Sequence, residues 1–125
     1  MEIKLIYNNL IQVLRLVASE ANVQIESFPQ YVNVTDEIAL LYSDIYSLVP
    51  QLVDAGLILS QHLAILNRID NLFEVMSNDE TLWNLERLED NASWKQSRLL
   101  AFEALMELNV SYEKPNLDFV KWMKS

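Results

Sequence analysis

The chain has 125 residues, of which 51% are hydrophobic and 22% charged, and its formal net charge is −9. This composition is typical of a folded domain with a sizeable core and excludes an intrinsically disordered chain. One glycine, one histidine and no cysteine exclude glycine-rich nucleotide loops, disulfides, thiolate metal sites and most histidine-based catalytic sites, and the negative charge opposes binding to nucleic acid.

The first expected helix runs from residue 3 to about residue 23. Its hydrophobic positions recur every three or four residues and nearly encircle the helix, which predicts a central place in a bundle. Residues 27–34 follow, and Pro29 together with a poor alternation pattern indicates a loop. Phe28 and Tyr31 are expected to anchor this loop to one end of the core.

The second expected helix begins at a cap formed by Thr35 or Asp36, because either side chain can accept a hydrogen bond from a first-turn amide. Pro50 lies within the hydrophobic pattern and lacks an amide hydrogen. The helix therefore either kinks there or stops near Ser47 and restarts with Pro50 in its first turn. Gly56 is expected to end it. The predicted core positions are Ile38, Leu41, Tyr42, Ile45, Leu48, Val49 and Leu52.

The third expected helix has the most regular hydrophobic pattern in the chain. It is predicted to be capped by Ser60 and to end near Ser77. Its predicted core positions are Ile65, Leu66, Ile69, Leu72, Phe73 and Met76. A short fourth helix over about residues 80–88 is expected to bury Leu82, Leu85 and Leu88.

A fifth helix is expected to begin at an Asn91 cap and to end at Asn109. Its predicted core positions are Trp94, Ala101, Leu105 and Leu108. Pro115 followed by Asn116 allows a last helical turn or two, through Phe119 and Trp122. Because no strand pattern, repeat or linker divides the chain, we predict an all-α protein in which residues 1–125 form a single irregular bundle of five or six helices.

The acidic residues are concentrated in the middle of the chain. Residues 16–67 contain six carboxylates and no lysine or arginine, and residues 68–90 contain seven carboxylates and two arginines. Like charges one helical turn apart, such as Asp70 with Glu74 and Glu86 with Asp90, destabilise an isolated helix. Stability therefore does not explain these pairs.

This charge pattern permits two interpretations. One is a solvated acidic face, since charged residues usually face water. The other is a binding surface, because a field of one sign attracts a basic partner while isolated hydrophobic or aromatic residues hold it. Leu40, Tyr46 and Trp83 are the predicted anchors of such a surface. At about 100° per residue, Leu40 shares its helix face with acidic residues, which are Asp36, Glu37 and Asp44.

The residues give little support to a catalytic function. Clustered carboxylates such as Asp36 and Asp44 could bind Mg²⁺ or Ca²⁺, but the only glycine lies outside any calcium-loop pattern. Ser60 and His62 form no triad, because no orienting carboxylate or oxyanion donors can be identified. We expect His62 to be a packed or capping residue, and we expect no enzyme activity, no metal site and no cofactor.

Several short stretches between Phe28 and Leu108 carry a resemblance to a known class of proteins. They are Phe28-Pro29, residues 36–39, 48–52 and 56–58, Met76-Ser77, Leu82-Trp83, and Trp94 followed by Arg98. Together they resemble the small helical immunity proteins that bacteria encode beside polymorphic toxins, as in contact-dependent growth inhibition systems. The resemblance implies a protein that binds one cognate toxin domain, often a basic nuclease, and blocks its active site or substrate groove.

The predicted function is therefore that of an immunity protein that neutralises a basic toxin domain through an acidic surface. The predicted toxin-binding residues are Asp36, Glu37, Leu40, Asp44, Tyr46, Asp70, Glu74, Trp83, Glu86 and Asp90. We expect a cytoplasmic protein with no membrane partner, which is a monomer when free. Two alternatives are kept: a structural or adaptor bundle that associates through the apolar end near Phe28 and Tyr31, and a small metal-dependent hydrolase.

Overall fold

Four long helices form the frame of the structure, a computed structural model that describes residues 2–121. They are α1 (Ile3–Ala18), α3 (Val34–Tyr46), α5 (Ser60–Met76) and α7 (Ala92–Glu107). Shorter elements connect them, namely α2 (Ala21–Glu26), α4 (Val49–Asp54), the 3-10 helix η1 (Glu80–Leu82) and α6 (Leu85–Asp90). No strand occurs over residues 2–121, and the predicted all-α bundle is confirmed.

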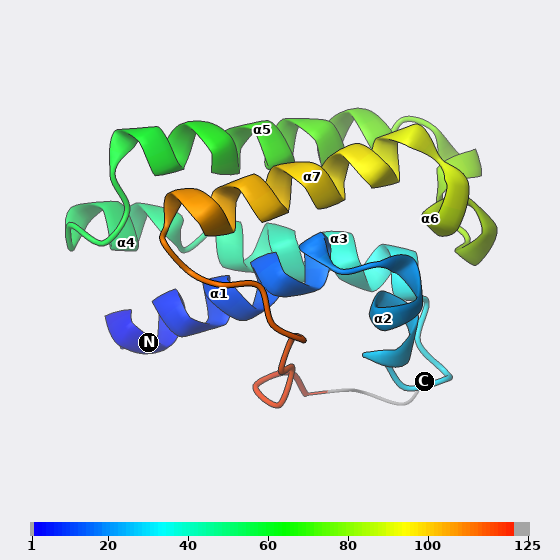
Figure 1. Cartoon of the computed structure of the whole chain (residues 1–125), viewed down its shortest axis with the longest axis horizontal. Helices are drawn as coiled ribbons and strands as arrows, with labels where there is room; N and C mark the ends of the chain where they lie inside the picture. The colour runs from blue at the N-terminus through cyan, green and yellow to red at the C-terminus, as the bar shows by residue number, and fades with distance from the viewer. Residues whose placement is uncertain (1, 122–125) are drawn as a thin grey trace.

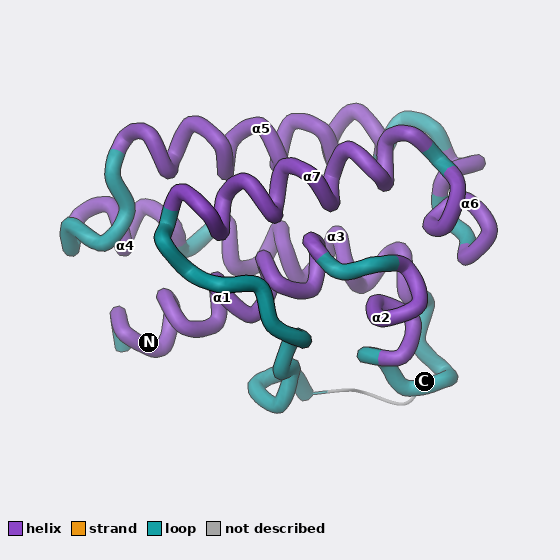
Figure 2. The backbone as a smooth tube through the Cα atoms, in the orientation of Figure 1, coloured by secondary structure: helices purple, strands orange, loops and turns teal. Residues whose placement is uncertain are grey.

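The helices pack in two layers (Figure 1). Helix α7 runs antiparallel to α5, and α1 packs against both α7 and α3. Helix α1 also contacts α4, so it touches three other helices, as its nearly encircling hydrophobic surface predicts. The helical segments follow one another through short connections, with the longest non-helical stretch at the C-terminal end (Figure 2).

The first helix ends earlier than predicted, because the backbone becomes extended at Ser19. Side-chain hydrogen bonds replace the helical ones at this break. The side-chain nitrogen Nε2 of Gln24 donates to the carbonyls of Leu16 and Val17 at 3.1 and 3.2 Å, and the backbone amide of Ser19 donates to the Leu16 carbonyl. The predicted helix over residues 3–23 is therefore two helices, α1 and α2.

The cap of α3 is Asn33 and not Thr35 or Asp36. The Asn33 carboxamide oxygen accepts a hydrogen bond from the Asp36 amide, and Thr35 is buried as a first-turn residue. The restart at Pro50 is confirmed, since α3 ends at Tyr46 and Pro50 lies in the first turn of α4. Gly56 then ends α4 with a φ of 79°, a conformation that glycine adopts without strain.

Ser60 is the first residue of α5 and not its cap. His62 takes the capping role instead, because its Nδ1 accepts the Leu59 amide hydrogen at 3.0 Å. Its Nε2 faces the Glu107 carbonyl oxygen at 3.2 Å and donates to it. His62 therefore joins the start of α5 to the end of α7.

The predicted fourth helix is divided at Trp83 and Asn84 into η1 and α6. The division has a tertiary cause, because the Leu82 carbonyl accepts a hydrogen bond from the buried Trp94 indole at 2.8 Å instead of continuing a helix. Leu85 is 50% exposed, so the prediction that it is buried in the core is wrong. The Asn91 cap is confirmed, since its side chain accepts from the Ser93 and Trp94 amides.

The predicted ending of the fifth helix at Asn109 is confirmed by a φ of 57° and by a hydrogen bond from the Val110 amide to the Leu105 carbonyl. The helical turn expected after Pro115 is not formed in the described residues. Instead, the Asp118 amide donates to the Asn116 side chain, and the Asn116 amide donates to the Gln12 side chain. Trp122 lies outside the described residues. This C-terminal segment packs along α1, where Arg15 donates to the Ser111 carbonyl and pairs with Glu113.

Candidate functional site

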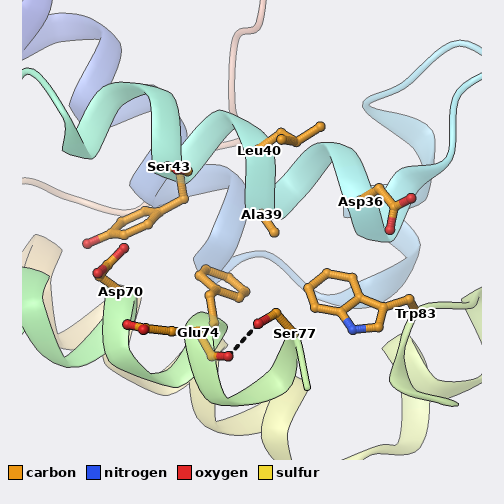
Figure 3. Close-up of a pocket in the computed structure, with 10 residues that line it drawn as sticks. Asp36, Ala39, Leu40, Ser43, Asp70, Glu74, Ser77 and Trp83 are labelled. Atoms are coloured by element: carbon orange, nitrogen blue, oxygen red, sulfur yellow. Dashed lines mark hydrogen bonds between the residues drawn. The ribbon is translucent and has the colours of Figure 1, made fainter. Parts of the chain in front are cut away.

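An open groove with a volume of about 660 Å³ lies between α3 and α5 (Figure 3). Helix α3 contributes Asp36, Ala39, Leu40 and Ser43, and α5 contributes Asp70, Phe73 and Glu74. Trp83, which follows η1, closes one end. The groove is possible because Ala39 and Ser43, one turn apart on α3, are too small to fill the space that faces α5.

The charged groups of the groove all carry the same sign. Asp36 belongs to the first turn of α3, where a carboxylate stabilises the positive end of the helix dipole. Asp70 and Glu74 lie one turn apart on α5 and reach the groove from the opposite wall. No lysine or arginine lines it. Partial burial raises the pKa of Asp70, and the negative charge of Glu74 raises it further.

Aromatic rings form a continuous row from the groove into the core. Tyr46 stacks on Tyr42 with ring centroids 5.8 Å apart, and Tyr42 meets Phe73 at 5.7 Å. The edge contacts continue from Phe73 to Trp94 at 5.9 Å and from Trp94 to Trp83 at 5.2 Å. Such contacts add to the hydrophobic gain of burial, so the groove has a rigid aromatic floor.

The two tyrosines at the end of this row are held by hydrogen bonds. The Tyr42 hydroxyl donates to the Leu66 carbonyl at 2.6 Å, and the Tyr46 hydroxyl donates to the Asn67 side chain. Burial raises the pKa of Tyr42, and the charges of Tyr46 and Asp70 add to this effect. Burial and Asp70 likewise raise the pKa of Tyr46. Both phenols therefore remain protonated donors.

Trp83 is half-buried and fixed in orientation. Its indole nitrogen donates to the Met76 carbonyl at 3.0 Å, at the end of α5, and its ring packs edge-on against the fully buried Trp94. The turn that carries Trp83 is set by Asp79, whose carboxylate accepts from the Thr81 amide and hydroxyl and thereby has a lowered pKa. The part of the Trp83 ring that remains exposed faces the groove.

The structure brings together half of the residues that the sequence nominated for binding. Those that line the groove are Asp36, Leu40, Asp70, Glu74 and Trp83.

The other five lie elsewhere. Tyr46 is half-buried behind Tyr42. Glu37 is half-buried outside the groove, and Asp44 lines a separate hollow beside α1 and the C-terminal segment. Glu86 and Asp90 are exposed on α6, where Asp90 pairs with Arg87 at 3.5 Å.

Phe73 and Ser77 belong to the groove but were not nominated for it. Phe73 was assigned to the core because of its place in the hydrophobic pattern, and it is indeed 93% buried, yet one side of its ring reaches the groove. The sequence signal that points to the groove is the pair of small residues, Ala39 and Ser43. They interrupt an otherwise bulky helix surface on the side that faces α5.

Over residues 2–121, no group of three or more histidine, aspartate or glutamate side chains is placed to hold a metal ion. Within the same residues no helix has both the length and the hydrophobicity needed to span a membrane. Comparison of the chain with protein-family models, with curated proteins and with solved structures gives no match.

Proposed function

We propose that this protein is an immunity protein that binds a basic toxin domain, such as a nuclease, through the groove between α3 and α5. The observation that supports the proposal is the composition of the groove, in which Asp36, Asp70 and Glu74 surround an aromatic floor with no basic residue among them. The sequence likeness to bacterial immunity proteins points in the same direction.

The groove suits a positively charged side chain that projects from a partner. Figure 3 shows Asp70 and Glu74 toward one end of the groove and Asp36 beside Trp83 toward the other. An arginine guanidinium at the first end would pair with Asp70 and Glu74. One at the second end would pair with Asp36 and stack on the exposed part of Trp83, since cations are attracted to aromatic faces. Carboxylates bind guanidinium groups through charge-assisted hydrogen bonds, which supply affinity as well as orientation.

A nuclease must present positive side chains to hold the phosphates of its substrate. An acidic groove can occupy those side chains, so that binding of this protein excludes the nucleic acid. The net charge of −9 would accelerate the encounter, because opposite fields steer the two proteins together. In this proposal the protein acts by binding alone, in the cytoplasm of the producing cell, with neither catalysis nor a cofactor.

The test is co-purification with a defined partner. The tagged protein is mixed with a catalytically inactivated C-terminal domain of the protein encoded immediately upstream, at low and at high salt. We expect a one-to-one complex at both, because the aromatic floor contributes affinity that salt does not screen.

A variant with Trp83→Ala is expected to lose the complex at high salt first. The matched control is Phe119→Ala, which removes another partly exposed aromatic ring outside the groove. Absence of a complex at either salt concentration, or equal losses in the two variants, would contradict the proposal.

A further inference from the structure

Helix α7 has hydrophobic residues on two opposite sides. Trp94, Ala101 and Leu105 point into the core and are buried. On the other side, Leu99, Phe102 and Met106 are 67%, 44% and 58% exposed, and their spacing of three and four residues places them in one stripe.

This stripe is uncovered. Figure 1 shows α7 along the near side of the bundle with no other helix in front of it. Tyr112 of the C-terminal segment extends the stripe, with its ring 6.5 Å from that of Phe102. A continuous row of large exposed hydrophobic residues is typical of a surface that binds another protein.

The charges beside the stripe change sign along the helix. Lys95 is exposed one turn before Leu99, whereas Glu103 and Glu107 are exposed in the second half of the helix. Arg98 is turned toward α6, because its guanidinium donates to the Leu88 carbonyl at 3.0 Å. The exposed side of α7 is therefore basic in its first half and acidic in its second half.

We propose that two copies of this protein form a dimer through α7, with the two α7 helices antiparallel about a twofold axis. In this arrangement Leu99 of each copy packs near Phe102 of the other, because both lie close to the middle of the helix. Lys95 of each copy then lies near Glu103 and Glu107 of the other. A parallel arrangement would place like charges together, so the charge pattern selects the antiparallel one.

A second copy fits this surface better than another partner, because the pattern is complementary to itself. Two copies with a net charge of −9 repel each other over most of their surface, whereas α7 contains two basic and two acidic residues. The inference is independent of the proposed function, since no residue of α7 lines the groove between α3 and α5. It replaces the monomer that the sequence alone suggested.

The first test measures the molar mass by sedimentation equilibrium, from micromolar concentrations up to about 1 mM. We expect a monomer–dimer equilibrium whose Kd rises at least about tenfold in the variant Leu99→Lys with Met106→Lys. The matched control is Leu5→Lys with Val53→Lys, which adds the same charge at two exposed hydrophobic positions on α1 and α4. Because both variants reduce the net negative charge, a weaker dimer in the first alone locates the contact on α7.

The second test examines the antiparallel arrangement. Lys95→Glu is expected to weaken the dimer, and so is Glu103→Lys with Glu107→Lys, although the latter lowers the repulsion between copies. The combination of all three substitutions should restore the dimer, because it exchanges the charges at both ends of the contact.

A wild-type protein that stays monomeric over the whole concentration range would overturn the proposal. So would a dimer that the Leu99 and Met106 substitutions leave unchanged, or one that the control variant weakens equally. If the three charge substitutions together weaken the dimer more than either set alone, the antiparallel arrangement is wrong.

Discussion

Asp70 occupies a position that is unfavourable for its own charge. It is partly buried beside Glu74, and its negative charge in turn raises the pKa values of Tyr42 and Tyr46, both already raised by burial. A folded-state pKa above the ordinary value means that ionisation of Asp70 opposes folding. The ionised Asp70 side chain therefore lowers the stability of the fold, which agrees with a role in binding.

Asp70→Asn is therefore expected to stabilise the protein at neutral pH. The gain should be a few tenths of a kcal/mol, because solvent screens the partly exposed carboxylate. It should vanish as the pH falls below the ordinary aspartate pKa of 3.8, where the folded and unfolded states are both protonated. Urea unfolding at about pH 7 and about pH 3.5, with Asp54→Asn on α4 as the control, measures the difference. A loss of stability at neutral pH would contradict this account of Asp70.

His62→Ala is expected to reduce the free energy of unfolding by about 1–2 kcal/mol, because it removes the cap on the Leu59 amide and the bond to the Glu107 carbonyl. Urea unfolding measures the change. The neighbouring Gln61→Ala, at an exposed position of the same helical turn, is the control. Equal stability of the two variants would show that the hydrogen bonds of His62 contribute nothing.

At the scale of elements, local patterns predict the long helices well, because each core face is fixed by spacing within one segment. The interruptions are different. The break after α1 depends on Gln24 and on the contact of Ser19 with Tyr112, 93 residues away. The division of the fourth predicted helix depends on Trp94. No local sequence pattern contains these tertiary hydrogen bonds.

Gln24→Leu is expected to destabilise the fold by about 1–3 kcal/mol, because the buried Val17 carbonyl loses its Gln24 donor and the Leu16 carbonyl keeps only the Ser19 amide. The leucine has nearly the volume of glutamine, so packing changes little. The control is Asn22→Ala, at an exposed position of α2. Thermal and urea unfolding should agree on the order of the variants, and unfolding of Gln24→Leu at the wild-type midpoint would refute the role of Gln24 as a substitute for helical hydrogen bonds.

At the scale of the whole molecule, the packing of α3 against α5 decides which acidic residues act together. The sequence places Asp70 and Glu74 on one face of one helix, so their proximity is predictable. Their approach to Asp36 and Trp83 depends on how separate elements pack, which a single helical wheel does not contain. For the same reason the wheel groups Asp44 with Asp36, whereas Asp44 lies in another hollow.

The salt dependence of binding to the proposed partner tests the central claim most directly. Calorimetric titration with the C-terminal domain of the protein encoded immediately upstream would compare the wild type with the variant Asp36→Asn, Asp70→Asn, Glu74→Gln. The control is Glu26→Gln, Asp54→Asn, Asp118→Asn, which removes the same charge outside the groove. We expect the groove variant to lose at least about a hundredfold in affinity and most of the salt dependence, and the control to lose little. Equal effects of the two variants would show that the acidic groove is a solvated surface and not the binding site.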